Sequence, residues 1–309
     1  MKLTISPGTR HASLTLLAPI AWGTTYVTIT EFLPDDRPLF IAACRIIPAA
    51  FVLLAVGKLT RKGKAPARDW NTLFVLGLFN FGLFFPLLIA GIYRLPGGVA
   101  ASVGGIQPLL VALVAWRVIG TTPRRFDLFI GVAAAIGVAM VVLRPGAAID
   151  PVGVLAALGA NVSFSIGVVL TRKHDLGDDR LTTTGLQMLL SAVVIVPLAY
   201  LAEGPPPMLA TSDLIGIAYL SLLATGAAFL LWFNGVRRLP QQAPPVLGLA
   251  APITGATIGW LVLGESLNSI QIAGFLVTIG AIAYAATRGA ATQKVDASPI
   301  SSRHTLCNA

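Results

Sequence analysis

Charged residues divide this chain into long uncharged segments. Ten of these segments have about the 17–25 residues that an α-helix needs to cross a bilayer. They lie between Arg10 and Glu31, Arg37 and Lys58, Asp69 and Arg94, Arg94 and Arg117, Asp127 and Arg144, Asp150 and Arg172, Arg180 and Glu203, Asp213 and Arg237, Arg238 and Glu265, and Glu265 and Arg288. Only the second segment contains a charge, Arg45. The pattern predicts ten transmembrane segments.

Glycine and proline recur within the segments, which transmembrane helices tolerate because neighbouring helices satisfy the freed backbone groups. Strands of a membrane barrel would instead alternate in polarity over about 10 residues. Composition agrees: 55% of the residues are hydrophobic and 11% are charged, against about 45–50% and 25% in soluble domains. We therefore expect an all-α integral membrane protein rather than a water-soluble fold.

Lysine and arginine lie mostly on one side of the predicted membrane. Eighteen of the 22 basic residues fall on the side of the N-terminus, and three, Arg37, Arg94 and Arg144, fall on the other. Because basic loops stay in the cytoplasm, both termini are expected there, in a multi-pass protein of the cell membrane. The net charge of +9 thus reflects topology and does not indicate nucleic-acid binding.

Neither the two ends of the chain nor its cysteines change the predicted fold class. The first apolar segment is as long as the others and lacks a clear cleavage site, so we expect it to be retained rather than removed as a signal peptide. Residues 288–309 are polar, which predicts a disordered cytoplasmic tail. Cys44 and Cys307 are too few for a disulfide framework or a four-ligand zinc site.

The second half of the chain repeats the first at an offset of 144 residues. Ten of the thirty positions in Gly91–Gly120 are identical to those in Gly235–Gly264. The identical pairs are Gly91/Gly235, Arg94/Arg238, Leu95/Leu239, Pro96/Pro240, Gly104/Gly248, Pro108/Pro252, Ala112/Ala256, Trp116/Trp260, Val118/Val262 and Gly120/Gly264. The predicted units are residues 1–143 and 148–287.

Each unit holds five predicted helices, and because five is odd the second unit enters the membrane from the opposite side. The fold prediction is therefore ten transmembrane helices as two inverted five-helix repeats. Inverted repeats recur in secondary transporters, whose similar halves exchange conformations around a central site. Duplication for stability alone is the alternative.

Several motifs resemble a known family. They are Trp22-Gly23-Thr24-Thr25, Cys44-Arg45-Ile46, the segment from Pro108-Leu109 to Ala115-Trp116, and the segment from Pro252 to Trp260-Leu261-Val262-Leu263-Gly264-Glu265. Together they resemble the drug/metabolite transporter superfamily, specifically its ten-helix EamA type, over about residues 12–287. The resemblance implies export of amino acids or related small metabolites through a cavity lined by predicted helices one, three, four, six, eight and nine.

Two positions depart from that family's pattern. Many members carry an acidic residue just before the second-half proline, where this chain has Ala251. The Gly-Glu motif of the first half is replaced by Gly120-Thr121.

Arg45 is the only ionisable residue inside a predicted helix, and intramembrane charges are functional candidates because their burial is costly. It lies seven residues beyond Pro38, about 10 Å along a helix that rises 1.5 Å per residue. One hypothesis is a structural arginine that bonds to a carbonyl or snorkels to the headgroups. The other is that Arg45 binds a substrate carboxylate.

Glycine and proline coincide in the fourth and ninth predicted helices. Gly104, Gly105 and Pro108 correspond to Gly248 and Pro252 in the repeat. A proline removes a backbone hydrogen bond and frees a carbonyl, which predicts a break in both helices near the midplane. Paired interruptions point to a transport site, whereas close helix packing is the alternative.

Polar and aromatic residues at similar depth are the candidate lining of a cavity, although interhelical hydrogen bonding would also explain the amides. The predicted substrate-binding residues are Trp22, Thr25, Tyr26, Asn80, Gln107, Pro108, Asn161, Phe164, Tyr219, Trp232 and Pro252.

An enzyme is not expected. His11, His174 and His304 lie outside the uncharged segments, as do all carboxylates and lysines, so no catalytic pair can be assembled at depth. Neither a metal nor a cofactor is predicted. A non-transporting scaffold or assembly subunit stays the alternative function, and the sequence leaves a homodimer open.

The expected substrates are zwitterionic or neutral small molecules. A cationic solute would find no buried carboxylate as a partner, although aromatic faces supply part of that attraction. The missing acid also removes the usual proton relay, so the sequence does not indicate the form of energy coupling.

The topology yields a first prediction. A reporter fused after Lys64 is expected in the cytoplasm and one fused after Leu143 in the periplasm, because the loops at those positions fall on the basic and the non-basic side. Enzymatic reporters active in only one compartment measure this. A periplasmic signal after Lys64 would contradict the topology.

Overall fold

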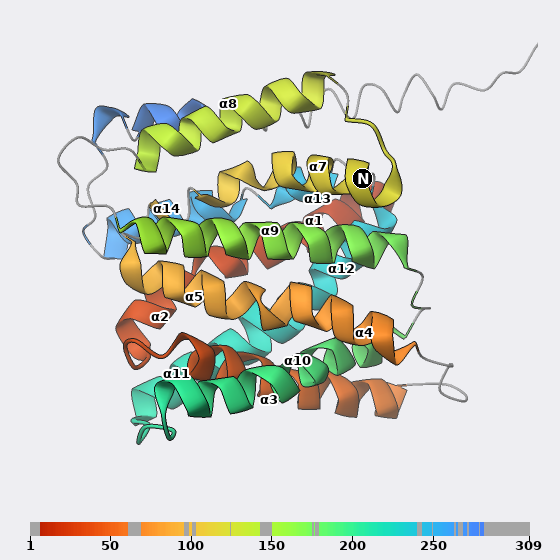
Figure 1. The fold of residues 1–309 in the computed structure, drawn as a ribbon, viewed down its shortest axis with the longest axis vertical. Helices are drawn as coiled ribbons and strands as arrows, with labels where there is room; N and C mark the ends of the chain where they lie inside the picture. The colour runs from red at the N-terminus through yellow and green to blue at the C-terminus, as the bar shows by residue number, and fades with distance from the viewer. Residues whose placement is uncertain are drawn as a thin grey trace, which may run out of the picture.

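The computed structural model describes residues 7–60, 69–95, 99–100, 103–123, 125–142, 150–174, 176, 179–239, 243–248, 250–262, 264, 268–270, 272–277 and 279–280. Across these residues the secondary structure is helical, with no strand. The fold is therefore that of an all-helical integral membrane protein (Figure 1).

Helices of the first half are α1 (Pro7–Gly23), α2 (Thr25–Phe32), α3 (Pro38–Thr60), α4 (Trp70–Gly77), the π-helix η1 (Leu78–Gly82), α5 (Phe84–Arg94), the 3₁₀-helix η2 (Gly104–Ile106), α7 (Gln107–Ile119) and α8 (Arg125–Val142). Those of the second half are α9 (Pro151–Lys173), α10 (Arg180–Glu203), α11 (Thr211–Ala218), the π-helix η3 (Tyr219–Ala227), α12 (Ala228–Arg238), α13 (Ala243–Leu247) and α14 (Ala250–Val262).

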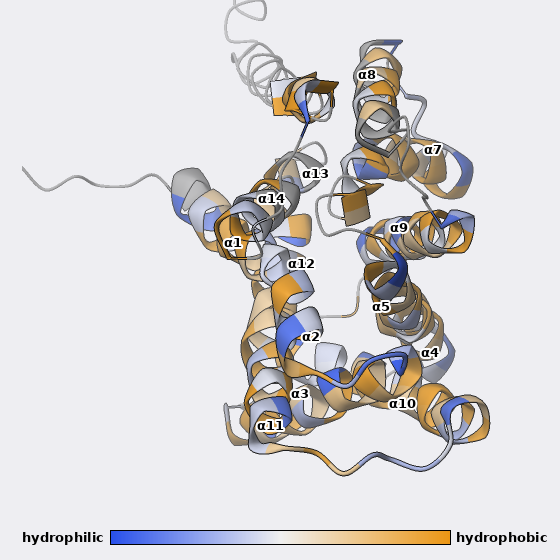
Figure 2. Ribbon diagram, turned by 90° about the vertical axis from the view of Figure 1, so that its left-hand side faces the viewer, coloured by the Kyte–Doolittle hydropathy of each residue, from blue (hydrophilic) through white to orange (hydrophobic). Residues whose placement is uncertain are grey.

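Six helical stretches among the described residues are long and apolar enough to cross a membrane. They are Arg10–Phe32, Pro38–Thr60, Trp70–Arg94, Pro151–Lys173, Arg180–Glu203 and Thr211–Arg238. Three of them join shorter elements end to end, such as α4, η1 and α5. Figure 2 turns the first view by 90° about the vertical axis and shows hydrophobic residues along much of α5, α9 and α10. The count of ten spans stays a prediction.

Aspartates fix where several helices begin. The Asp69 carboxylate accepts hydrogen bonds from the backbone N–H of Asn71 and Thr72, and Asp150 accepts from those of Val152 and Gly153. Such N-caps satisfy donors that have no partner within the helix. Asp150 also pairs with Arg94 at 2.8 Å, and that hydrogen bond is the main reason why its pKa lies below the usual value.

The long helices α3 and α10 run antiparallel along each other. At one end the Glu203 carboxylate of α10 accepts hydrogen bonds from the backbone N–H of Leu39 and Phe40 at 2.6 and 2.8 Å. At the other end Gly57 of α3 lies against Thr182. Figure 1 shows the two helices side by side. This pair joins the first half of the chain to the second.

Two further helix pairs also join the halves: α1 packs on α12, and α5 packs on α9. A glycine marks each contact, Gly235 on α12 and Gly91 on α5, and these residues stand 144 positions apart. A Cβ atom on Gly235 would overlap the Thr15 side chain, whereas one on Gly91 would lie 3.3 Å from Ala157. Small residues permit such close approach between membrane helices.

These two glycines give a second prediction. Gly235→Ala should lower the thermal unfolding temperature of the detergent-solubilised protein clearly, because α1 and α12 must separate to admit the methyl group. Gly91→Ala should cost far less, since its neighbours need to yield only a few tenths of an ångström. A core overpacking penalty is typically about 1–3 kcal/mol. Equal losses in the two variants would contradict this account of the packing.

Candidate functional site

Arg45 of α3 lies inside the bundle and is 1% exposed. Its Nε donates to the Thr225 hydroxyl at 2.6 Å, and its Nη2 donates to the Ala224 carbonyl at 3.1 Å and to the Thr25 hydroxyl at 3.3 Å. The guanidinium also stacks over the Phe85 ring, 4.3 Å from its centroid. The expectation that Arg45 snorkels to the headgroups is therefore wrong, because η3, α2 and α5 enclose the side chain.

The positive charge of Arg45 has no acidic partner among the residues that the structure describes. Its third nitrogen, Nη1, is buried and has no hydrogen-bond acceptor in this part of the chain. Leaving a buried charged donor unsatisfied is costly. Hydrogen bonds within the protein therefore satisfy Nε and Nη2 of Arg45 and leave Nη1 without a partner among the described residues.

Aromatic rings fill the space beside Arg45. Trp22 lies 4.9 Å from Phe229 and 5.0 Å from Trp232, measured between ring centroids, and 5.7 Å from Phe164. Phe229 in turn lies 5.7 Å from Phe85, the ring under the guanidinium. We call Trp22, Phe85, Phe164, Phe229 and Trp232 the aromatic cluster. It joins α1, α5, α9 and α12 and begins at Arg45.

The two indole N–H groups of this cluster differ. That of Trp22 donates to the Ala224 carbonyl at 3.0 Å, the same acceptor that Arg45 uses. That of Trp232 is buried, and no acceptor for it exists within the described residues. The aromatic cluster therefore carries one satisfied and one unsatisfied indole donor.

A second polar contact lies around Asn80 of η1, which is fully buried. Its side-chain amide donates to the Thr171 hydroxyl of α9 at 3.2 Å and to the Gln187 side-chain oxygen of α10 at 3.3 Å. Its own oxygen faces Gly167 so closely that a Cβ atom there would overlap it. The contact thus joins one helix of the first half to two of the second.

The helix interruptions occur where the sequence predicts them. A 3₁₀ turn spans Gly104–Ile106, and helix is interrupted at Gly248 between α13 and α14. The predicted free carbonyls, however, are not there. The Gln107 N–H donates to the Gly104 carbonyl, and the Ala251 N–H donates to the Gly248 carbonyl at 3.1 Å. The tighter i→i+3 bond replaces the one that the proline cannot make.

The structure divides the predicted lining residues into two groups. Trp22, Tyr26, Phe164, Tyr219 and Trp232 belong to or pack against one hydrophobic cluster, with Thr25 and Arg45 beside it. The Tyr219 hydroxyl lies 2.7 Å from that of Thr24. Tyr219 therefore ties η3 to the junction of α1 and α2.

The remaining lining residues lie elsewhere. Gln107 and Pro108 begin α7 and are half-buried. The Asn161 side-chain amide donates to the Ala157 carbonyl of its own helix, and its oxygen lies 4.0 Å from the point where a Cβ of Gly104 would stand. The side chain of Pro252 lies outside the described residues.

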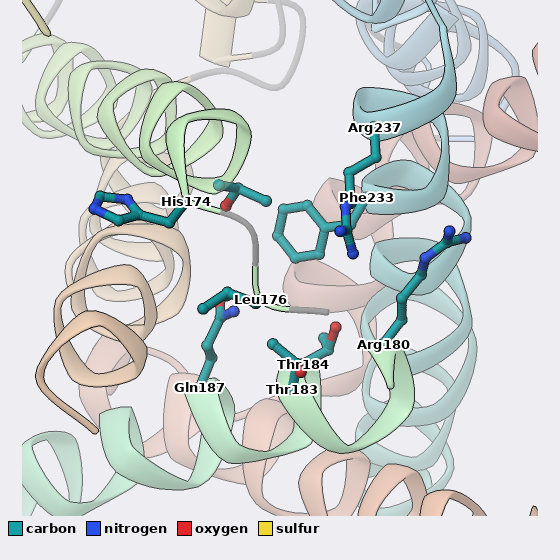
Figure 3. Close-up of a pocket in the computed structure, with 9 residues that line it drawn as sticks. His174, Leu176, Arg180, Thr183, Thr184, Gln187, Phe233 and Arg237 are labelled. Carbon is teal, nitrogen blue, oxygen red and sulfur yellow. The ribbon is translucent and has the colours of Figure 1, made fainter. Parts of the chain in front are cut away.

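A pocket between α9, α10 and α12 was missed by the sequence reasoning (Figure 3). It is partly open to solvent and is lined by Thr171, His174, Leu176, Arg180, Thr183, Thr184, Gln187, Phe233 and Arg237. Figure 3 shows Phe233 and Arg237 of α12 facing Thr184 and Gln187 of α10. Gln187 could have indicated this pocket, because like Asn80 it is an amide side chain inside a long uncharged segment.

No metal site stands out: the described residues contain no group of three or more histidine, cysteine or acidic side chains that would hold an ion. The buried polar atoms near the aromatic cluster are instead hydroxyls, amides, an indole and a guanidinium. Such groups can bind and orient a polar solute.

Family comparison agrees with this arrangement. The model of the EamA-like transporter family matches residues 10–143 and again residues 151–287. The chain belongs to the EamA-like transporter family.

Relatives of this EamA-like transporter include Protein PecM of Dickeya dadantii (strain 3937). The two are 35% identical over 268 residues, which cover 86% of this chain and 88% of the relative. A probable amino-acid metabolite efflux pump of Salmonella typhimurium (strain LT2) is 26% identical over 282 residues, covering 87% and 92% of the two chains.

A solved crystal structure shares the fold of the EamA-like transporter. It superposes with a TM-score of 0.73 at 18% sequence identity and covers 93% of this chain and 99% of its own. Together with the apolar helices, the family assignment makes this chain a multi-pass membrane transporter of small metabolites.

Arg45 gives a third prediction. Arg45→Lys should destabilise the transporter more than Arg45→Met, because lysine keeps the buried charge but cannot bond to both Thr225 and Ala224. Methionine fills similar volume and removes the charge, so only the neutral acceptors Thr225 and Ala224 lose a donor. We expect a loss of about 3 kcal/mol for lysine, measured by thermal unfolding in detergent. A lysine variant at least as stable as the methionine variant would show that these hydrogen bonds contribute little.

Proposed function

We propose that this chain is a secondary transporter that exports small zwitterionic or neutral metabolites, such as amino acids and related compounds, across the cytoplasmic membrane by alternating access. The two unsatisfied donors beside the aromatic cluster carry this proposal. Arg45 Nη1 and Trp232 Nε1 are both buried and both lack an acceptor among the described residues. A solute that brings its own acceptors would satisfy them.

The chemistry of these donors favours a carboxylate-bearing solute. The free Nη1 of a guanidinium donates a charge-assisted hydrogen bond to a carboxylate oxygen. The absence of an acid beside Arg45 in the described part of the chain disfavours a cationic solute, which would meet only positive charge. The aromatic rings supply an apolar wall for the remainder of the solute.

Alternating access is supported by the repeat. Interruptions of the same kind occur at Gly104 and Gly248, and π-helices occur at η1 and η3, in each case at positions 144 residues apart. Corresponding discontinuities in the two halves are typical of transporters built from inverted repeats. We infer that the two halves rock against each other around the aromatic cluster, with both termini in the cytoplasm.

The name of the Salmonella relative, a probable amino-acid metabolite efflux pump, supports export of amino-acid metabolites. The proposed solute pathway comprises Trp22, Thr25, Tyr26, Arg45, Asn80, Gln107, Pro108, Asn161, Phe164, Tyr219, Trp232 and Pro252. The competing function is a scaffold that transports nothing. Only a transporter should respond to solute at the pathway residues, and this response distinguishes the two functions.

The fourth prediction tests this site. Trp232→Phe keeps an aromatic ring and removes the unsatisfied donor, so transport of a carboxylate-bearing substrate into proteoliposomes should show a raised KM. A hydrogen bond to a charged group is worth about 1.5–3 kcal/mol, which corresponds to roughly tenfold to hundredfold in KM. A panel of labelled amino acids identifies the substrate first.

The matched control is Trp260→Phe, because Trp260 is an exposed indole on α14. It should transport as the parent does. If Trp232→Phe and Trp260→Phe behave alike in a folded, transporting protein, the solute does not use the Trp232 donor. If no solute in the panel is transported by the parent protein, the scaffold alternative gains support.

A further inference from the structure

The contacts around Arg45 and Asn80 resemble each other in where they lie on their helices. Asn80 of η1 and Ala224 of η3 stand 144 positions apart, and each lies in a π-helix. Asn80 bonds to Gln187 of α10, and the Ala224 carbonyl accepts a bond from Arg45 of α3. Gln187 and Arg45 both stand seven residues after the first residue of their helix. The two contacts are similarly placed, but the π-helix donates through the Asn80 side chain in one and accepts through the Ala224 carbonyl in the other.

The two contacts lie toward opposite ends of the bundle. Each is about 10 Å from the start of its own helix, at a rise of 1.5 Å per residue. Because α3 and α10 run antiparallel, with Glu203 at the start of α3 and Thr182 near its end, these starts face opposite sides.

Both contacts also cross between the two halves of the chain. Asn80 belongs to the first half, and its partners Thr171 and Gln187 belong to the second. Thr225 and Ala224 belong to the second half, and their partner Arg45 belongs to the first. A movement of one half against the other would stretch these bonds.

We propose that these contacts are two latches that close opposite ends of the solute pathway and are released in turn. The Asn80 latch consists of Asn80, Thr171 and Gln187, and the Arg45 latch consists of Arg45, Thr25, Ala224 and Thr225. The inference rests on the proposed alternating-access function. The hydrogen bonds of both latches are formed in this structure.

Each latch includes residues of a π-helix, η1 for the Asn80 latch and η3 for the Arg45 latch. A π-turn inserts an extra residue into a helix and often marks a functional position. In η3 the Ala224 carbonyl accepts two side-chain donors, from Trp22 and Arg45. Opening therefore requires η1 or η3 to lose side-chain bonds to the other half, while the regular helices on either side move as rigid segments.

The latches differ in strength. The bonds of Arg45 are charge-assisted and therefore roughly twice as strong as the neutral bonds of Asn80. The Asn80 end, which also borders the pocket of Figure 3 through Thr171 and Gln187, is thus the end that opens more readily. A carboxylate that reached Arg45 would compete with Ala224 for the guanidinium and release the second latch.

The fifth prediction measures the opening of each end. Thr184→Cys reports on the Asn80 end, since Thr184 lines the pocket beside Gln187. Ser221→Cys reports on the Arg45 end, because Ser221 lies in η3 one turn before Thr225 and is fully buried. Both cysteines are placed in a Cys44→Ala, Cys307→Ala background, and labelling by a small aqueous thiol reagent is timed on protein in nanodiscs, without substrate.

Gln187→Leu should speed labelling at Thr184→Cys and slow it at Ser221→Cys. Thr225→Val, which removes an acceptor of Arg45, should do the reverse. The expected change is between about twofold and tenfold, as one buried hydrogen bond implies. Thr171→Val is the second variant of the Asn80 latch, in case Gln187→Leu does not fold. Ser165→Ala is the control, since that buried hydroxyl bonds only to its own helix and should change neither rate.

The proposal would be overturned if folded variants of both latches raised the labelling rate at both cysteines, or at neither of them. The outcome is independent of transport. Reciprocal changes in a protein that transports no tested solute would support the latches and contradict the export function. Transport with parallel or absent changes in labelling would support the export function and contradict the latches.

Discussion

A guanidinium inside a membrane bundle has to be satisfied by the protein, and the arrangement around Arg45 meets most of that requirement. Helix α3 brings the charge, the π-helix η3 offers the Ala224 carbonyl and the Thr225 hydroxyl, α2 adds Thr25, and α5 places Phe85 under the cation. These elements come from both halves of the chain. This one side chain therefore links elements of both halves, and its Nη1 has no acceptor among the described residues.

Irregular helix turns let this bundle place polar groups at depth without leaving the backbone unsatisfied. At Gly104 and at Gly248 a tighter hydrogen bond takes up the carbonyl that the following proline would have freed. At η1 and η3 a wider turn presents Asn80 and the Ala224 carbonyl to the neighbouring half. In a bilayer each such group needs a protein partner or a solute, which is why these turns coincide with the interhelical contacts.

The sequence predicted well what depends on local spacing. The positions of the interruptions follow from Gly104, Pro108, Gly248 and Pro252, and the family follows from motifs such as Trp22-Gly23-Thr24-Thr25. The environment of Arg45 was predicted less well. A residue seven positions into a helix lies within reach of the interface by length alone, and only the packing of η3 shows that the side chain turns inward instead.

By itself, then, the sequence determined the helical membrane class, the repeat and the residue types at depth, because charge spacing, proline and glycine act on the chain within a few residues. The tertiary structure decided which of these residues meet. It brought Trp22, Phe164 and Trp232 into one cluster, placed Gln107 and Asn161 apart from it, and revealed Gln187 as the partner of Asn80. Contacts between residues more than a hundred positions apart depend on how each helix is rotated about its axis and on the angle at which helices cross. Hydrophobic spacing determines neither the rotation nor the crossing angle in helices that are apolar on every face.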